Sequence, residues 1–524
     1  MKKLHNKYNC KYLLLPIAAG QPLKDVFLYV DKALAYEFRI PAAGGEECYE
    51  FQYYAPLSLE NCMGREIEID GDVGNAFLEA ISFSDAIPWK ADFHPTVHFS
   101  ANTGWINDPN GFFYRDGVYH LYFQHNPFDT LWGNMSWGHA VSTDLLHWEQ
   151  RDTVLYPDGD GTIFSGCALV DENGRLTFFY TSAGNTSHWS RDKKFSQKLA
   201  WSADGGESIT KTDIVAVPPI AGGNRDPKVY WHKESQGYYM VLYLEKNEFA
   251  ILRSMDLVDW KLTQRLELED AWECPDLFRV PVEGGTSRWV FWCADGFYFL
   301  GDFDGYSFTR TSEKMQAYAT ALPYAAQSCW GADRVISIPW LRSGNPGRTY
   351  TGVMGIPREL SLVERDGTLK MRQRLIGELA GCRRQIEGSI REDTVFYTAK
   401  AGCAVELVIE LGEEKDFSVL LGGIEIVCDA RSKKLEVTGC RVQKEEKNWR
   451  EAEKTQTGSG NCKKQIVLDK APDTVSILAD GEILEITLDD GMVCAAFEAE
   501  SGQEREQTQA AVKTLGKINF YEIR

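Results

Sequence analysis

The chain has 524 residues, too many for a single hydrophobic core, so we expect several domains. Its formal net charge of −20 would repel phosphate backbones and anionic membrane surfaces, which argues against nucleic acid as a partner. The 13 cysteines are scattered, without a Cys-x-x-Cys pair or zinc-like histidine spacing. They predict neither a disulfide framework nor a metal site, and they favour a reducing compartment.

The N-terminal segment has the lysines and short apolar run of a signal peptide, but Lys11 stands directly before that run. Tyr12 to Ile17 therefore predicts a strand, and we expect a cytoplasmic protein, with secretion as the alternative. No apolar stretch approaches the ~20 residues that a membrane span requires. Strand-like runs at residues 25–40 and 65–73 predict a small N-terminal β module, residues 1–92.

One pattern recurs through residues 93–376: a polar or acidic start, an apolar strand, a turn and a second apolar strand. Its copies occupy residues 108–123, 165–180, 226–243, 273–292 and, more weakly, 328–340. A period of about 50 to 60 residues in an all-β chain is typical of propeller blades with four strands each. The sequence thus predicts an all-β fold with a five-bladed β-propeller; a sandwich with chance periodicity is the alternative.

A shorter echo supports the repeat. Residues 142–148 and 254–260 share the pattern S-x-D-L-x-x-W, each at a similar place after its hairpin. Residues 369–392 then read as helix or coil, and we place a linker at residues 377–394. The final part, residues 395–524, is expected to be a C-terminal β-sandwich, because runs such as 405–411, 418–427 and 476–488 alternate like strands.

Acidic residues stand beside prolines at three of the repeat starts: Asp108, Asp226 and Glu273. The tetrapeptide at 108–111, DPNG, would by itself predict a reverse turn. A proline suits the first residue of a strand, and it favours an extended backbone for the residue before it. In a propeller the innermost strands begin around one axis, so the three carboxylates are expected to face one cavity.

Such a cluster points to glycosidic bond cleavage. Crowded carboxylates raise the pKa of at least one member, which lets a site hold a neutral acid beside an ionised base. A retaining glycosidase needs one carboxylate as nucleophile and one carboxyl as acid, about 5 to 5.5 Å apart. A third carboxylate can bind ring hydroxyls.

These residues lie in motifs that resemble glycoside hydrolase family 32, the invertases, inulinases, levanases and other β-fructofuranosidases. The matching strings are WINDPNG (105–111), RDP (225–227) and WECPDLF (272–278). Further stretches such as YAAQS (324–328) are similar too, and the similarity extends over about residues 95–500. The resemblance implies that Asp108 is the nucleophile, Glu273 the acid/base and Asp226 the transition-state stabiliser. It also implies a fructose subsite lined by Trp105, Asn107, Gln124, Trp132, Phe164, Ser165, Arg225 and Trp340.

The expected reaction is release of β-fructose from sucrose, fructo-oligosaccharides or fructans by double displacement, without a metal or organic cofactor. Trp105 would supply an apolar wall and Asn107 an amide to the sugar, while Arg225 is expected to keep Asp226 ionised. Ser136 stands where the family often has histidine, and Arg374 where it often has proline. These departures leave substrate length open.

Three alternatives stay open at this point. An arabinanase or xylosidase on a related propeller would carry different motifs around its acids. A fructosyltransferase would share all three acids and differ in its acceptor site. A non-catalytic fructan-binding module would be expected to lack Asp108 or Glu273, and both are present. The sequence does not fix the preferred substrate, endo or exo action, or the oligomeric state.

Overall fold

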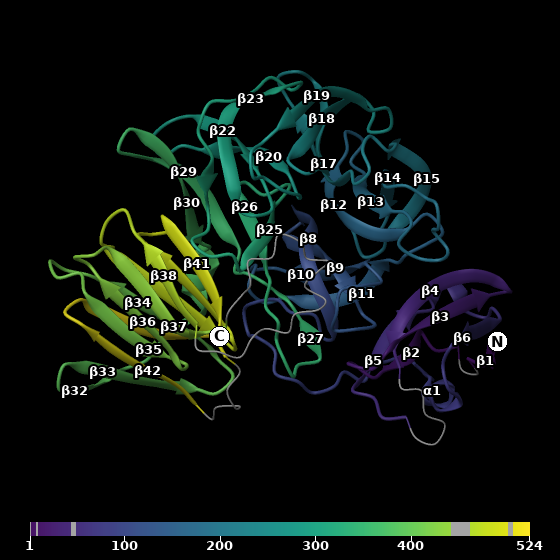
Figure 1. Ribbon diagram of the computed structural model, residues 1–524, viewed down its shortest axis with the longest axis horizontal. Coiled ribbons are helices and arrows are strands. Elements are labelled where there is room, and N and C mark those ends of the chain that lie inside the picture. Colours follow the sequence, from purple (N-terminus) through teal and green to yellow (C-terminus); the bar gives the residue numbers. More distant parts are fainter. Residues whose placement is uncertain (1, 7–8, 43–48, 442–461, 501–506) are drawn as a thin grey trace.

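A computed structural model describes residues 2–6, 9–42, 49–441, 462–500 and 507–524. The chain is almost entirely β-structure, as expected (Figure 1). A small N-terminal module and a C-terminal pair of sheets lie on either side of a larger central region. The helices within the described ranges are short: η1 (Glu60–Cys62), α1 (Asn75–Ala80) and η2 (Gly377–Cys382). None of them is long and apolar enough to cross a membrane.

The N-terminal module consists of two sheets around a shared apolar core. The expected strand at Tyr12–Ile17 is confirmed as β2, which is buried along its whole length. The run at residues 25–40 forms a hairpin of two strands rather than one element. The first sheet has the order β1 (Lys2–Leu4), β6 (Ile67–Gly71), β3 (Leu23–Val30), β4 (Ala33–Pro41), and the second β5 (Tyr53–Ser58), β2, β7 (Ser82–Ser84).

Five antiparallel sheets follow one another in the central region. The first holds β11 (Glu149–Leu155), β10 (Ser136–Ser142), β9 (Val118–Asn126) and β8 (Gly104–Arg115), with β27 (Tyr350–Thr351) parallel to β8. The second holds β12 (Thr162–Val170), β13 (Leu176–Ala183), β14 (Ser196–Ser202) and β15 (Thr210–Val217), and the third β16 (Arg225–His232), β17 (Gly237–Glu245), β18 (Glu248–Ser254) and β19 (Lys261–Glu267).

The last two sheets complete the series. The fourth holds β20 (Asp276–Pro281), β21 (Ser287–Trp292), β22 (Phe297–Phe303), β23 (Phe308–Arg310) and β24 (Met315–Gln316). The fifth holds β25 (Pro323–Ser328), β26 (Ile336–Leu341), β28 (Val353–Met354), β29 (Arg358–Arg365) and β30 (Thr368–Leu375). Residues 369–375, expected to be helix or coil, are therefore a strand, because a regular ladder with β29 supplies their backbone hydrogen bonds.

The two copies of the S-x-D-L-x-x-W motif form the same turn, which confirms the repeat between them. Leu145 N donates to Ser142 Oγ at 2.9 Å, and in the later copy Leu257 N donates to Ser254 Oγ at 2.9 Å. Both leucines have positive φ, 66° and 67°. The tryptophan that ends each copy donates its indole N–H to the carbonyl of that leucine. The echo thus marks equivalent positions in two sheets.

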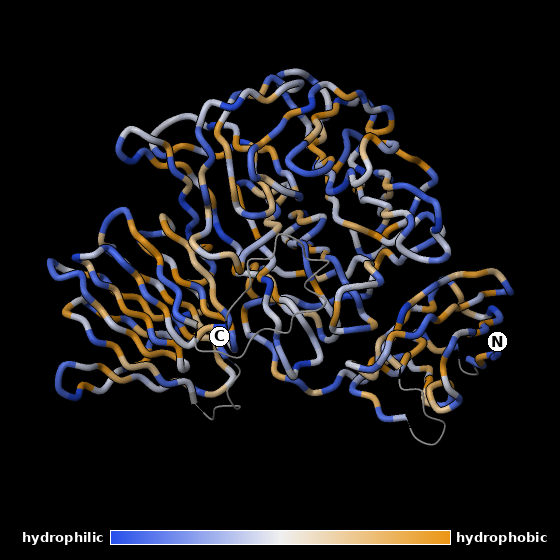
Figure 2. The backbone as a smooth tube through the Cα atoms, in the orientation of Figure 1, coloured by the Kyte–Doolittle hydropathy of each residue, from blue (hydrophilic) through white to orange (hydrophobic). Residues whose placement is uncertain are grey.

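The C-terminal part consists of two packed sheets with one apolar core between them. Hydrophobic and hydrophilic stretches alternate along its strands (Figure 2), as the alternating sequence predicts. Two of the expected single strands are hairpins, because glycines at 422–423 and 481 turn the chain. One sheet has the order β31 (Arg383–Gln385), β43 (Lys517–Ile523), β34 (Ala404–Glu410), β39 (Thr474–Asp480), β40 (Ile483–Leu488), β41 (Val493–Glu498).

The other sheet has the order β32 (Ser389–Arg391), β33 (Thr394–Lys400), β42 (Gln507–Thr514), β35 (Phe417–Leu421), β36 (Ile424–Asp429), β37 (Lys434–Cys440), β38 (Cys462–Val467). Two parts of the predicted sandwich, residues 442–461 and 501–506, lie outside the described residues. The segment placed as a linker contains η2 and the short strands β31 and β32.

A buried ionic cluster joins the two-sheet part to the central region. The ring of His98 lies between Asp480, 3.0 Å from Nδ1, and Glu485, 3.1 Å from Nε2. Hydrogen bonds and charges from both carboxylates outweigh burial and raise the pKa of His98 to about 9. Glu485 also pairs with Arg358 of β29 at 2.5 Å. The two parts are thus held in a fixed relation by charges that water does not screen.

Candidate active site

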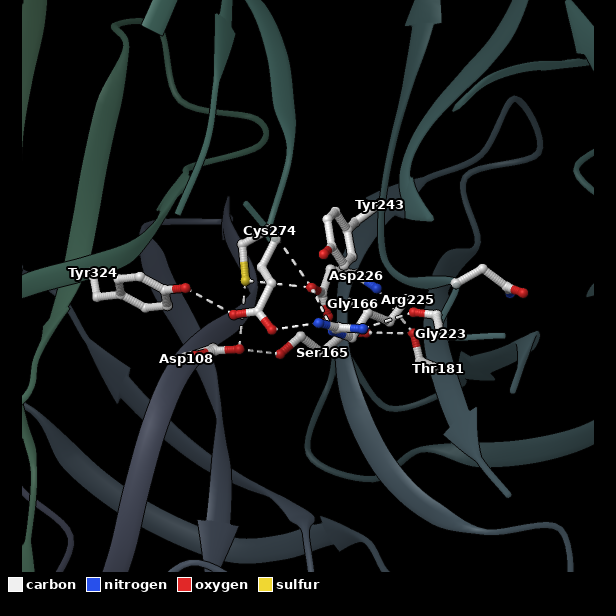
Figure 3. A network of polar contacts seen from close by, with 12 residues as sticks. Asp108, Ser165, Gly166, Thr181, Gly223, Arg225, Asp226, Tyr243, Cys274 and Tyr324 are labelled. Carbon is white, nitrogen blue, oxygen red and sulfur yellow. Dashed lines mark hydrogen bonds and ion pairs between the residues drawn. The ribbon is translucent and has the colours of Figure 1, made fainter. Parts of the chain in front are cut away.

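The three predicted acids lie close enough to influence one another, although they come from different parts of the central region. Figure 3 shows Asp108 and Asp226 linked through the Cys274 sulfur. Asp108 lies in β8, Asp226 in β16, and Glu273 shortly before β20. A carboxylate oxygen of Asp108, one of Asp226 and the sulfur of Cys274 all lie within 4.8 Å of one another. The convergence that the repeat predicts is therefore present in the structure.

Backbone irregularities, rather than turns, aim these side chains. The DPNG sequence is part of strand β8, whose register with β9 shifts between Ile106 and Pro109. The ladder of β16 shifts likewise between Arg225 and Lys228. Such bulges re-aim a side chain beside an active site.

The expectation of an extended backbone before each proline is wrong at two positions. Asp226, which precedes Pro227, has φ +62°, and Cys274, which precedes Pro275, has φ +41°. Glu273 has φ +41° as well. Non-glycine residues reach this region at a cost of about 1–3 kcal/mol, which the surrounding structure must offset.

Asp108 is held by donors from two sheets. Ser165 Oγ donates to Asp108 Oδ2 at 2.6 Å, and the Cys274 thiol lies 3.5 Å from the same oxygen. Asn107 interacts with the carboxylate too, and its own Oδ1 accepts from the Trp105 indole at 2.8 Å. The residue keeps some exposure to the pocket, but its carboxylate is desolvated. Burial raises the pKa of Asp108 against the lowering effect of these hydrogen bonds.

Asp226 is buried, and its backbone N–H donates to Thr181 Oγ1 at 3.0 Å. Its Oδ2 accepts from the Cys274 N–H at 3.1 Å. Burial raises the pKa of Asp226 to about 7; Arg225 lowers it, whereas Glu273 and Asp108 raise it. Arg225 thus acts in the expected direction and lowers the pKa of Asp226, but desolvation and the two neighbouring carboxylates act more strongly in the opposite direction.

Arg225 is paired mainly with Glu273 rather than with Asp226. Its Nη2 contacts Glu273 Oε1, whereas its Nε lies 3.7 Å from Asp226 Oδ2. The guanidinium also packs over the Tyr243 ring and donates to the Gly223 carbonyl. On the other side, Tyr324 Oη donates to Glu273 Oε2 at 2.8 Å. Both carboxylate oxygens of Glu273 are thus held, by Arg225 and Tyr324, which Figure 3 labels.

Tyr324 and Cys274 are site residues that sequence reasoning did not assign. Both belong to strings that resemble the family, YAAQS and WECPDLF, and that was the only signal for them. Burial raises the pKa of the Cys274 thiol, and the three carboxylates raise it further. The thiol is therefore protonated and acts as a hydrogen-bond donor between Asp108 and Asp226.

An aromatic wall lies beside the carboxylates. Trp105 contacts Trp340 edge-on at 5.8 Å between ring centroids, and Trp340 contacts Tyr324 at 6.3 Å. Trp132 contacts Phe164 at 6.0 Å, and Trp105 packs against the same small cluster. The structure thus brings these four predicted aromatic residues together at one side of the site.

Gln124 is the predicted residue with the weakest structural link to the carboxylates. It lies on β9 opposite Trp137, and its side chain is buried. Within the described residues, its Nε2 and the indole N–H of Trp340 have no hydrogen-bond partner. Buried donors of this kind are uncommon in native proteins.

A second set of polar contacts braces the first strands of the sheets beneath the acids. Gln327 accepts from Phe112 N at 2.9 Å and donates to Gly166 O at 3.0 Å. Asn110 accepts from Gly166 N at 3.0 Å. A small cavity at this level is lined by Pro109, Ser165, Gly166, Asp226, Pro227, Lys228, Cys274, Pro275, Asp276, Ala325, Ala326 and Gln327.

Carboxylates from the first, third and fourth of the central sheets thus converge beside an aromatic wall in this all-β protein. Residues 98–373 match the model of the glycosyl hydrolases family 32 N-terminal domain. The chain belongs to glycoside hydrolase family 32.

Individual relatives agree with this assignment. A levanase of Bacillus subtilis (strain 168) is 34% identical over 315 residues, covering 53% of this chain and 46% of that protein. An invertase of Debaryomyces hansenii is 37% identical over 300 residues, covering 49% and 56%. The chain thus spans about half the length of these curated relatives.

A solved structure matches over a longer stretch. The crystal structure of exo-inulinase from Aspergillus awamori aligns with a TM-score of 0.70 and 24% identity, covering 84% of this chain and 99% of that one. The architecture shared with such neighbours is a β-propeller followed by a β-sandwich.

Proposed function

We propose that this protein is a retaining β-fructofuranosidase that releases β-fructose from sucrose, fructo-oligosaccharides or fructans. The observation that carries the proposal is the clustering of Asp108, Asp226 and Glu273, each in a family motif, beside an aromatic wall. The relatives named levanase, invertase and exo-inulinase support fructosides as the substrate class.

Asp108 acts as the nucleophile in this proposal. Its carboxylate attacks the anomeric carbon of the fructosyl unit, and the bond to the leaving oxygen breaks. The donors from Ser165 and Asn107 fix the carboxylate and oppose the rise in its pKa. They therefore favour the ionised form that attack requires.

Glu273 acts as the acid/base. It donates a proton to the leaving oxygen, and in the second step it takes a proton from the water that releases fructose from Asp108. Arg225 and Tyr324 hold its two oxygens in place.

Asp226 stabilises the transition state in this proposal by accepting hydrogen bonds from fructosyl hydroxyls. Burial raises the pKa of Asp226 to about 7, so Asp226 is partly protonated in the free site at neutral pH. Hydroxyls that donate to Asp226 favour its ionised form, which lets the proton reside on Glu273 when substrate is bound.

We further propose that the five central sheets are five propeller blades. Hydrogen bonds link their first strands: Ser165 of β12 to Asp108 of β8, Tyr230 of β16 to Asp276 of β20, and Gln327 of β25 back to β8 and β12. The bounds we propose are residues 1–92 for the N-terminal module, 93–376 for the propeller, 377–394 for the linker and 395–524 for the sandwich. A cytoplasmic location is also a proposal; it is supported by buried free thiols at Cys62, Cys167 and Cys293.

The test measures products from sucrose, short fructo-oligosaccharides, inulin and levan with the purified protein and with Glu273→Gln. Fructose as the sole product, with most of the rate lost in the variant, supports an exo-acting fructofuranosidase. Transfer products at high sucrose would indicate a transferase instead. Cleavage of arabinan or xylan alone, or binding of fructan without cleavage, would overturn the proposal.

A further inference from the structure

The N-terminal module contacts two loops that carry aromatic residues of the wall beside the acids. Loop 127–135 joins β9 to β10 and carries Trp132. Loop 184–195 joins β13 to β14 and carries Phe195, whose ring contacts Phe164 at 5.5 Å. Trp132 and Phe195 pack in the same small cluster as Trp105. The position of this side of the wall therefore depends on the two loops.

Strand β4 of the module holds loop 127–135 through its edge. β4 is the last strand of its sheet, so one side of its backbone faces away from the ladder. Arg39 N donates to Asn134 Oδ1 at 2.8 Å, and Asn134 Nδ2 donates to Arg39 O at 2.9 Å. The same amide donates to Asn126 Oδ1 at 3.0 Å. The Asn134 side chain thus pairs with the exposed edge as a neighbouring strand would.

The same loop is anchored by an aromatic residue. Phe128 is fully buried in the core of the N-terminal module, and its ring lies 4.2 Å from that of Phe38 on β4. A loop residue that completes the core of another module cannot leave without opening a cavity there.

The neighbouring residue on β4 holds loop 184–195. The Glu37 carboxylate is buried and accepts from three donors: His188 N at 2.9 Å, His188 Nδ1 at 3.0 Å and Trp189 N at 2.7 Å. Charge-assisted bonds of this kind are stronger than neutral ones. Three consecutive residues of β4, Glu37 to Arg39, therefore fasten both loops.

We propose that the N-terminal module is a specificity element of the active site, with Asn134 and Glu37 as positioning residues that set Trp132 and Phe195 for the fructosyl ring. This inference rests on the proposed function. The three carboxylates are held by separate contacts within the central region, such as Ser165 on Asp108 and Arg225 on Glu273. Loosening the loops should therefore weaken sugar binding and leave the chemical step in place.

The experiment compares kcat and KM for sucrose and a short fructo-oligosaccharide in full-length variants. Asn134→Gly removes the amide and still accepts the positive φ of 44° at this position. Glu37→Ala removes the acceptor, and Glu37→Gln keeps one oxygen for the backbone donors. Arg65→Gln is the matched control, because it breaks an ion pair with Asp31 inside the same module.

We expect KM to rise about tenfold in Asn134→Gly and Glu37→Ala, with kcat within about twofold, and Glu37→Gln to recover most of the loss. Arg65→Gln should leave both constants unchanged. In a Trp132→Ala background, Asn134→Gly should raise KM little further, because both changes act through one contact. Unchanged KM, a fall in kcat alone, or an equal effect of the control would overturn the proposal.

A second measurement does not need activity. Amide hydrogen exchange in residues 127–135 and 184–195 should accelerate in the two loop variants and not in the control. If Asn134→Gly does not fold, Asn134→Asp, which loses only the donated bonds, carries the same expectation. A parent protein that cleaves no fructoside refutes the proposed function, whereas an active parent with unchanged variants refutes only the role of the module.

Discussion

Replacing Ser165 with alanine tests the proposed state of the nucleophile. The Ser165 hydroxyl donates to Asp108 Oδ2 at 2.6 Å and is the largest of the influences that lower the pKa of Asp108. Burial acts in the opposite direction and prevails. Without the hydroxyl, the ionised form of Asp108 loses its strongest donor, so the pKa must rise further.

The size of the shift follows from the strength of the bond. A hydrogen bond to a charged group contributes about 1.5–3 kcal/mol, and one pKa unit corresponds to about 1.4 kcal/mol. We therefore expect the acidic limb of kcat/KM against pH to move up by about 1–2 units in Ser165→Ala. The direction follows because the limb reports the loss of ionised Asp108 in the free enzyme as pH falls.

The assay is the initial rate of fructose release at low substrate concentration across the pH range. Ser182→Ala is the control, because Ser182 is a buried serine of the adjacent strand β13 whose hydroxyl has no partner among the described residues. The acidic limb of kcat/KM against pH should lie at the same pH in Ser182→Ala as in the parent. An acidic limb in Ser165→Ala that stays in place or moves down would refute the assignment of Asp108 as the ionised nucleophile.

Three other changes test the electrostatics and the wall. Asp226→Asn should raise Tm at pH 8 but not at pH 4, because a pKa raised from 3.8 to about 7 means that stability falls as pH rises between these values and stays low above them; a Tm that falls at both pH values would contradict this. Denaturant titrations of the parent should show the unfolding free energy falling by about 3 kcal/mol at most between pH 7 and 10, because the stabilising proton of His98 leaves as pH passes about 9. His98→Gln should show no such fall. Gly352→Ala should raise KM by displacing Trp340, because a Cβ at residue 352, where φ is +84°, would lie 2.4 Å from Ile106 O and 2.8 Å from Trp340 Nε1. A variant with the KM and Tm of the parent would show that this close contact does not matter.

The repeat and the three acids could be predicted because each depends on a short, contiguous stretch of sequence. Each first strand pairs with the next along the chain, so its apolar run and its turn are contiguous and recur visibly. The acidic starts then fall in phase. Sheet membership in the C-terminal part was harder, since β34 pairs with β39 and β43 across long separations that no local pattern encodes.

The partner of Arg225 and the role of the N-terminal module could not be predicted, for a related reason. Arg225 adjoins Asp226 in sequence, so sequence favours that pair, but the guanidinium extends across to the next sheet and meets Glu273. The module likewise shows no motif of its own, because it meets the two loops through a strand edge and a buried carboxylate, over sequence separations of 95 and 151 residues. The partner of Arg225 depends on the length of its side chain, and the contacts of the module depend on residues far away in the sequence.

Backbone irregularity in the first strands explains why the acids can converge at all. In a regular strand, successive side chains alternate between the two faces of the sheet, where they pack against neighbouring sheets. A side chain reaches the shared pocket only where that alternation is broken. Breaks occur at Asp108, at Ser165, at Asp226 and at Ala325, the last with φ +50°. The backbone strain is thus located in the strands that carry the site. The hydrogen bonds of Asn110 and Gln327 to Gly166 stabilise these strands and offset the strain.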